Sequence, residues 1–490
     1  MKKVYGIDLG ATFSCIAHIG SNDEAEVISN LDGMPVTRSA VFFEDGGIVV
    51  GDGAKESAYT DPDNFVHLIK REMGTPWRKE FLGNEHTPES ISSLILKYMV
   101  KGAEMSGLDV KDVVITCPAY FNEAERQATK IAGELTGLNV LAVVDEPVAA
   151  LVGYGVLSDS EQSKNPRLVI TYHLGGSTFD LTALMVSGKE VTIVCSDGDP
   201  SLGGTDWDAA LRDLLLDKFS IENPNAGDLM ADPETRAELM TTVETTKMRL
   251  SQRETAPARI TCCDGSWCKV SVTRAEFEEA TRPLLMRTTE LTNKLISNAF
   301  ERTGIHTISD FLLEGGSTYM PQVMEMVNEQ FKSRLDNLPK LSQPDQVVAK
   351  GAAMIATGRY IHSPRTDSSP ALKRSYATRN YGIKFETSMG ESYCYNLLKK
   401  GTMLPCASRT FVLASSGNES NALSCIIYSN QVLNDTLVPL LVCKKEKEIH
   451  VSLNENLAKV AKINLRMELD ETENLHVHLA DEDGVLDINM

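Results

Sequence analysis

A strand followed by a glycine turn occurs twice in the sequence, and this repeat constrains the fold more than any other feature. In the first copy, a mainly apolar run at residues 4–9 precedes Gly10, Ala11 and Thr12. In the second, the apolar residues 168–174 precede Gly175, Gly176, Ser177 and Thr178. Backbone N–H groups exposed at such turns form concave anion sites. The first copy alone is equally consistent with an ordinary hairpin, but the repeat predicts two similar lobes, each offering a phosphate loop to a shared cleft.

The residue at the strand end differs between the two copies. Asp8 ends the first strand and could hold Mg²⁺ through water, since this ion usually binds few carboxylates together with phosphate oxygens. His173 takes the corresponding place in the second copy. An imidazole is a poor ligand for Mg²⁺, which prefers oxygen.

The composition excludes several classes of partner. The chain has 490 residues and a net charge of −20, and such acidity argues against broad binding to nucleic acid or to anionic lipid. No apolar run is long enough to span a membrane or to serve as an export signal. Most cysteines lie inside apolar runs, which is typical of reduced, buried thiols. We therefore expect a cytoplasmic protein without a membrane or nucleic-acid partner.

The order of the elements predicts an α/β fold followed by an all-β segment. Strands at 113–116 and 140–144 alternate with amphipathic helices at 123–135 and from Glu146 onward. The composition changes near residue 361, so we expect a domain at 1–358, a linker at 359–380 and a further domain at 381–490. In that last domain, residues 462–469 and 475–479 alternate strictly between apolar and polar, which indicates a half-buried antiparallel sheet.

Seven motifs together resemble the 70-kDa heat-shock chaperone family. They are GIDLGATFS at 6–14, VVITCPAYFNEAERQATKIAGELTGLNVL at 113–141, DEPVAALVGYG at 145–155, HLGGSTFD at 173–180, SLGGTDWD at 201–208, LEGGST at 313–318 and DQVVAKGAA at 345–353. The motifs stand in family order within residues 1–358, and they are most similar to the divergent bacterial HscC-type members. The resemblance implies a two-lobed actin-like ATPase domain followed by a β-sandwich that binds peptide.

The resemblance also implies a site for ATP or ADP with Mg²⁺ between the lobes. The residues that would bind the nucleotide are Gly10, Ala11, Thr12, Phe13, Gly175, Gly176, Ser177, Thr178, Gly203, Gly204, Glu244, Lys247, Met248, Ser251, Gly315, Gly316, Ser317, Tyr319 and Asp345. Glu244, Lys247 and Ser251 also share one helical face by their spacing. Without the resemblance, an exposed salt-bridged face would be the better interpretation of these three.

The implied chemistry is phosphoryl transfer to water, in which a protein mainly positions groups and neutralises charge. Lys70 matches the family lysine that reaches the γ-phosphate and the attacking water, and Glu146 matches a carboxylate near the metal. Asp8 would hold Mg²⁺ through water, with His173 as a degenerate fourth member of the catalytic set. Pro118 and Arg126 match a pair that relays the nucleotide state to the next domain.

Several positions depart from the family pattern. His173 replaces a carboxylate near Mg²⁺, and Ala11 replaces a threonine hydroxyl near the γ-phosphate. Met248 and Tyr319 replace the arginine pair that sandwiches adenine, which removes a cation–π attraction. The linker lacks the family's run of leucines ending in aspartate. No long helical segment follows the last alternating strand, so we expect the family's helical lid to be missing.

Three functions remain open at this stage. The first is a chaperone that binds ATP, hydrolyses it slowly and engages unfolded polypeptide, with a J-domain co-chaperone and a nucleotide exchange factor as possible partners. Met389, Leu423 and Cys425 are candidate peptide-pocket residues, although sandwich core is an equally good interpretation. The second is a non-hydrolysing nucleotide-binding co-chaperone or scaffold, which His173 and Ala11 favour. The third is a sugar kinase or filament former, against which the 113–155 block and the β domain argue.

Overall fold

The structure is a computed structural model, and it divides the chain into two compact units that we describe separately. One comprises Met1–Glu190 and Ser196–Ser369, and the other Val191–Cys195 and Pro370–Met490. The described residues are 3–58, 61–157, 165–188, 190–224, 228–262, 265–358, 377, 379–386, 391–408, 410–414, 422–430, 436–440, 443–452, 462–470 and 475–480.

The first lobe of the larger unit contains a mixed sheet with the strand order β11-β10-β1-β2-β3, to which β4 adds by pairing with β2. β1 is parallel to β10 and β10 is parallel to β11, whereas β1 and β2 are antiparallel. The strands are β1 (Val4–Asp8), β2 (Phe13–Ile19), β3 (Ala25–Val27), β4 (Thr37–Arg38), β10 (Asp112–Cys117) and β11 (Asn139–Asp145). Its helices are α2 (Pro88–Met105), α3 (Glu123–Glu134), α4 (Glu146–Gly153) and α10 (Val347–Ala356).

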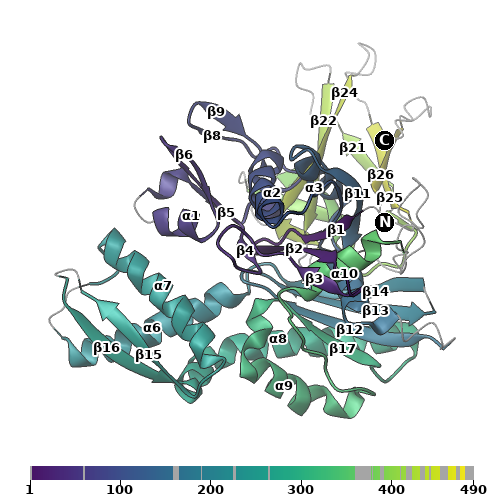
Figure 1. Cartoon of the computed structure of the whole chain (residues 1–490). Helices are drawn as coiled ribbons and strands as arrows, with labels where there is room; N and C mark the ends of the chain where they lie inside the picture. The colour runs from purple at the N-terminus through teal and green to yellow at the C-terminus, as the bar shows by residue number, and fades with distance from the viewer. Residues whose placement is uncertain are drawn as a thin grey trace. The chain divides into compact units, whose positions relative to one another are not determined.

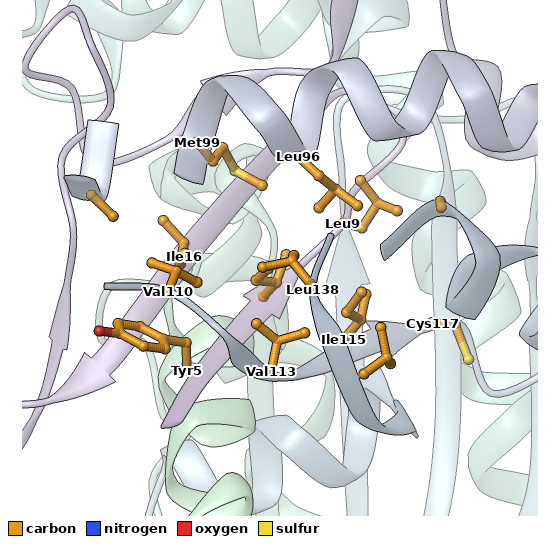
Figure 2. Packing of buried hydrophobic residues seen from close by; sticks show 14 of the residues in the cluster. Tyr5, Leu9, Ile16, Leu96, Met99, Val110, Val113, Ile115, Cys117 and Leu138 are labelled. Carbon is orange, nitrogen blue, oxygen red and sulfur yellow. The ribbon is translucent and has the colours of Figure 1, made fainter. Parts of the chain in front are cut away.

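Apolar side chains fill both faces of this sheet. On one face, Tyr5, Ile7 and Leu9 of the first strand segment pack in one buried cluster with residues of α2 and α3, part of which Figure 2 shows. On the other face, Cys15 and Ala17 of β2 pack against Ala349 and Ala353 of α10. Residues of a strand alternate between faces, so an apolar strand such as β1 suits a sheet covered on both sides.

The helix α10 lies beside the strands of the first lobe (Figure 1), and glycines at its contact points allow a close approach. A Cβ on Gly6 of β1 would lie 2.0 Å from the backbone N of Ala353, and one on Gly351 would lie 1.8 Å from the carbonyl oxygen of Ala149 in α4. A side chain at Gly6 would push the helix off the sheet, and one at Gly351 would push it away from α4. This packing fixes the end of β1, where the candidate site begins.

Smaller elements of the first lobe lie before α2 in the chain. They are β5 (Ala40–Glu44), β6 (Gly47–Val50), α1 (Asp52–Ser57), η1 (Pro62–Asn64), β7 (Phe65–His67), η2 (Ile69–Glu72), β8 (Lys79–Phe81) and β9 (Asn84–His86). The 3-10 turn η2 is preceded by Leu68 in the left-handed region, with φ 55°. The turn is tight, and it carries Lys70 and Arg71.

The second lobe repeats the arrangement of the first. β12 (Arg167–Leu174) lies between the antiparallel β13 (Phe179–Ser187) and the parallel β17 (Asp310–Glu314). β14 (Glu190–Asp199) contributes residues to both units. The other elements are α6 (Gly204–Glu222), α7 (Pro233–Leu250), β15 (Thr255–Thr261), β16 (Trp267–Thr273), α8 (Arg274–Thr303), η3 (Gly316–Tyr319), α9 (Pro321–Phe331) and η4 (Lys332–Arg334).

The smaller unit is built from antiparallel strands. One sheet has the order β23-β19-β18-β22-β24. The other has the order β20-β25-β21, and β26 also pairs with β25. Leu465, Met467 and Leu479 are fully buried in one cluster, as the alternation of these strands predicts. The strands are β18 (Asn380–Glu386), β19 (Ser392–Leu398), β20 (Cys406–Ala407), β21 (Phe411–Ala414), β22 (Ala422–Asn430), β23 (Leu437–Pro439), β24 (Lys444–Ser452), β25 (Lys462–Leu469) and β26 (Leu475–Ala480).

Among the helices within the described residues, none combines the length and the apolar character needed to cross a bilayer.

Candidate functional site

Asp8 lies at the carboxyl end of β1, beside Thr116 of the parallel strand β10. The Thr116 hydroxyl donates a hydrogen bond to Asp8 Oδ1 at 3.1 Å. Burial raises the pKa of Asp8 to about 6, with a further rise from the charge of Glu146 and an opposing effect from Lys70 and His173. Strand ends at one edge of a parallel sheet are where α/β folds gather ligand groups.

Lys70 and Glu146 form a buried ion pair next to Asp8. The Lys70 Nζ donates to Glu146 Oε1 at 2.5 Å, and both side chains are buried. Burial acts to lower the pKa of Lys70, but the charges of Glu146 and Asp8 outweigh it and raise that pKa. The turn η2 and the start of α4 thus hold a permanent cation where the first strand ends.

His173 and Glu314 are neighbours across the parallel strands β12 and β17. His173 Nδ1 lies 3.5 Å from Glu314 Oε2, and the Glu314 side chain is 1% exposed. Burial acts to lower the pKa of His173, but Glu314, Glu146 and Asp180 outweigh it and raise the pKa to about 9. Burial raises the pKa of Glu314 to about 7 although His173 opposes the rise. The two side chains are within ion-pair distance, and the surrounding carboxylates favour the protonated form of the imidazole.

The predicted phosphate loops meet one another. The Thr12 hydroxyl lies 3.4 Å from the Ser177 hydroxyl, and a Cβ on Gly176 would lie 2.6 Å from the Thr12 side chain. The Ser317 hydroxyl donates to the Gly175 carbonyl at 2.9 Å, and Gly204 N donates to the same oxygen at 3.0 Å. Residues 10–13, 175–178, 203–204 and 315–317 therefore surround one place in the larger unit.

Gly315 and Gly203 allow this approach of backbones. Gly315 has φ +83°, and a Cβ there would lie 2.3 Å from the Leu174 carbonyl oxygen. At Gly203, a Cβ would lie 2.5 Å from Ser177 N. Arg71 also donates to the Ser177 carbonyl at 2.6 Å and so holds the second loop from the side of η2. Gly316, Thr178 and Phe13 lie within the same loops.

Residues of α7 predicted to hold the nucleoside are already bound to other protein groups. Glu244 accepts hydrogen bonds from Arg38 at 2.9 Å and from Lys55. Burial acts to raise the pKa of Glu244, but these two cations lower it to about 2. Lys247 lies 2.8 Å from Asp208 Oδ1 and donates to the Gly204 carbonyl at 2.9 Å.

The remaining nucleoside candidates are more open. Ser251 donates only weakly within its own helix, to the Lys247 carbonyl at 3.4 Å. Met248 is 62% exposed and Tyr319 is 43% exposed. The Tyr319 hydroxyl donates to Asp345 Oδ1 at 2.9 Å, so these two residues are in contact. Two exposed flat or apolar side chains and a carboxylate are compatible with a purine edge, and their role in binding stays a prediction.

The predicted relay residues lie beside the charged cluster. One pocket is lined by residues that include Pro118, Tyr120, Glu146, His173, Asp180 and Glu314. Arg126 forms an ion pair with Asp145, the residue before Glu146, and donates to the Phe121 carbonyl at 3.0 Å. Pro118 is thus placed beside the candidate catalytic groups, whereas Arg126 is paired with Asp145, the neighbour of Glu146 in the chain.

Sequence reasoning missed Glu314 and Asp180 as members of the site. Glu314 is the last residue of the buried strand β17, so its position matched that of Asp8 and of His173. Asp180 faces His173 across the antiparallel pair β12–β13, and burial raises the pKa of Asp180 to about 6. The sequence did carry a signal for Glu314, namely a carboxylate at the end of an apolar strand. Asp180 could be recognised as a site residue only from the pairing of β13 with β12.

The structure describes two of the three predicted peptide-pocket residues. Met389 lies outside the described residues. Leu423 belongs to β22, in register with Val451 of β24. Cys425 packs in the main cluster of the β unit with Ile427 and Ile449. Cys425 therefore lies in the core of the β unit, which was one of the two interpretations given above. A contact of Cys425 with a peptide stays a prediction.

The donor groups fit an indirectly held Mg²⁺ at Asp8 but not at His173. Asp8 offers carboxylate oxygens, which this ion prefers, whereas an imidazole does not. Over the part of the chain that the structure describes, no three His, Cys, Asp or Glu side chains converge to ligate a metal. The ion would then depend on water and on phosphate oxygens.

Comparison with known proteins assigns the family. The family model described as "Hsp70 protein" matches residues 4–82 and 78–424. "Chaperone protein DnaK" from each of two strains of Halobacterium salinarum is 36% identical over 433 residues, which is 86% of this chain. The chain spans 64% of the length of these relatives. The matches confirm the resemblance and the predicted fold class of actin-like lobes followed by a β-sandwich, and the chain belongs to the Hsp70 family.

Proposed function

We propose that the chain is a chaperone of the Hsp70 type, which binds ATP between its two lobes, hydrolyses it slowly and engages unfolded polypeptide through its β unit. The observation that carries this proposal is the contact between the two predicted phosphate loops, the second of which also accepts a hydrogen bond from Arg71, the residue after Lys70. Loops 10–13 and 175–178 come within 3.4 Å of each other at Thr12 and Ser177. In this proposal residues 1–358 are the nucleotide domain, 359–380 the linker and 381–490 the peptide domain.

The chain's own groups would perform most of the work in hydrolysis. The backbone N–H groups of the loops would bind the phosphate oxygens, and Lys70 would stabilise charge that develops on the transferred phosphoryl group. Glu146 keeps the Lys70 ammonium in place at 2.5 Å. When bound, Mg²⁺ supplies neutralisation of phosphate charge, and Asp8 would hold it through water. His173 would not share that task.

Coupling to polypeptide would use the groups beside this cluster. Pro118 lines the pocket that also contains Glu146 and His173, so a change in nucleotide state could move it. Arg126, paired with Asp145, would carry that change onward. A J-domain co-chaperone and a nucleotide exchange factor are the partners that such a cycle needs. These roles and partners come from the family and are part of the proposal.

A second candidate function is a non-hydrolysing nucleotide-binding module, and His173 is the observation that favours it. The imidazole takes the place of a carboxylate beside the metal, and Ala11 lacks the hydroxyl that the family has near the γ-phosphate. Loss of one partner around a metal typically costs about 10–100-fold in affinity or activity. The site would then bind ATP without turning it over.

The two functions separate in a single-turnover experiment. Purified full chain is mixed with limiting ATP, and ADP formation and nucleotide affinity are measured for wild type and for the double variant His173→Asp, Ala11→Thr. Hydrolysis by wild type at a rate close to that of the variant supports the chaperone cycle. Binding without turnover in wild type, with turnover restored in the variant, supports the binding module. Failure of both proteins to bind ATP or ADP would overturn nucleotide binding itself.

A further inference from the structure

The His173 imidazole lies between a buried carboxylate and the second phosphate loop. Its Nδ1 faces Glu314 Oε2 at 3.5 Å. Its Nε2 points the other way, since a Cβ built on Gly175 would lie 3.3 Å from that atom. The strand register fixes both neighbours, because His173 pairs with Glu314 and the loop begins two residues after His173. The ring therefore presents one nitrogen to the carboxylate and the other to the loop.

Glu314 needs a cation at this position. It is 1% exposed, and its Oε1 accepts no hydrogen bond from any residue in the described ranges. A buried carboxylate stays ionised only if it is paired, so a neighbouring cation favours the charged form of Glu314. Lys70, the other cation of the cluster, is already bound to Glu146. The imidazolium of His173 is thus the group that balances Glu314.

The charges around His173 come from several elements. Asp180 on β13, Glu146 on α4 and Glu314 on β17 all act to keep the ring protonated, and they raise its pKa to about 9. A protonated ring has N–H donors at both nitrogens. With Nδ1 facing Glu314, the Nε2 donor is directed at the loop where phosphate oxygens would lie. An imidazolium also repels a nearby divalent cation, so it is unsuited to support one.

We propose that His173, positioned as an imidazolium by Glu314, binds the phosphate chain of the nucleotide directly through Nε2 and supplies positive charge that a divalent metal would otherwise provide. The inference rests on the proposed nucleotide binding and deepens it. Its consequence is that this site retains ADP when Mg²⁺ is removed. Glu314 is a positioning residue in this arrangement, since it acts through His173.

The test measures ADP affinity by calorimetry on the full chain, with Mg²⁺ and with EDTA. For His173→Gln we expect affinity in EDTA to fall about 10–100-fold below wild type, the effect of losing one charge-assisted hydrogen bond. With Mg²⁺ present, the loss should be smaller, because the ion supplies the charge. His306→Gln is the matched control, since His306 is an exposed histidine outside the site.

Glu314→Gln tests the positioning role separately. This variant keeps the ring but removes the carboxylate, so the imidazolium should persist only toward lower pH. In EDTA we expect the ADP affinity of this variant to match that of wild type at about pH 6. By about pH 8.5 the affinity of the variant should fall about tenfold, while that of wild type changes little. A residue with only a structural role would weaken binding equally at both pH values.

Three results would overturn the inference. In the first, wild type and His173→Gln lose affinity by the same factor on removal of Mg²⁺, so His173 does not supply charge in place of the ion. In the second, Glu314→Gln shows the wild-type pH profile, so Glu314 does not hold the imidazolium. In the third, ADP fails to bind wild type under every condition, which overturns the proposed function as well. The first two results overturn this inference alone and leave the proposed nucleotide binding intact.

Discussion

The ends of β1 and β12 occupy the same place in their two lobes, but their charges differ. Asp8 lies beside Thr116 of a parallel strand and Cys15 of an antiparallel one. At the corresponding positions, His173 lies beside Glu314 and Asp180. The first strand end thus carries an anion with neutral neighbours, and the second carries a cation with two anions.

The two lobes nevertheless reach the same charge balance. Two carboxylates and one cation form each group: Asp8 and Glu146 with Lys70, and Asp180 and Glu314 with His173. In the first group the cation comes from a separate element, the turn η2. In the second it stands on the strand itself. A residue such as His173 therefore has to be evaluated together with its cross-strand partner, because Glu314 lies beside it and carries the opposite charge.

Removing the cation of the first group should have the largest effect. Lys70→Met would leave Glu146 buried without its ion pair, which costs about 3–5 kcal/mol of folding stability in typical cases. We expect single-turnover ATP hydrolysis to fall about 100-fold or more, because the side chain proposed to stabilise the transferred phosphoryl group is lost. Lys70→Arg, which keeps the charge, is the control for stability. Hydrolysis unchanged in a folded Lys70→Met protein would show that the first group is not catalytic.

Separating the two loops should have the next largest effect. Gly176→Ala would place a Cβ 2.6 Å from Thr12, so the loops of the two lobes would be forced apart. We expect ADP affinity to fall about tenfold, the scale on which one charge-assisted hydrogen bond is lost. Gly46→Ala is the matched control, since a Cβ there would have no neighbour closer than 4.0 Å. Equal ADP affinities of the two variants would contradict a shared phosphate site.

The contact of α7 with Arg38 and Lys55 should set the rate of nucleotide release. Glu244→Gln removes the charge that binds both cations, and we expect ADP to dissociate several-fold to about tenfold faster in stopped-flow displacement. The folded-state pKa of Glu244 is lowered to about 2, so its contribution to stability is present above about pH 4.5 and lost as the pH falls through about 2. Glu234→Gln, an exposed change on the same helix, should leave release unchanged.

The smallest effect is expected at the adenine end of the site. Met248→Arg would restore the cation that the family has on one face of adenine, and at an exposed position such a cation–π contact is worth about 0.5–1 kcal/mol. ADP affinity should therefore rise about two- to fivefold by calorimetry. Met286→Arg places the same change on an exposed position of α8 and serves as control. A rise of the same size in the control would assign the gain to net charge instead of to base stacking.

Much of the fold followed from the sequence, because strand–turn repeats, strict alternation and family motifs are local patterns. The same motifs led to Asp8, Lys70, Glu146 and His173, and the structure brings their charges together. Glu314 was missed although it ends an apolar strand, and Asp180 did not follow because its position depends on the antiparallel register of β13 with β12. The engagement of Glu244 with Arg38 was hidden for the same reason, since residues far apart in sequence meet only in the folded chain.

The protonation state of His173 tests the central claim most directly, and NMR titration of its labelled imidazole measures it. We expect a pKa of about 9 in wild type and a clearly lower value in Glu314→Gln. The pKa of His173 in the folded chain exceeds its value of about 6.5 in the unfolded chain. The ring therefore contributes its full stabilisation below about pH 6.5 and loses it as the pH rises through about 9. A wild-type pKa at or below the unfolded value, or one unchanged in Glu314→Gln, would contradict the account.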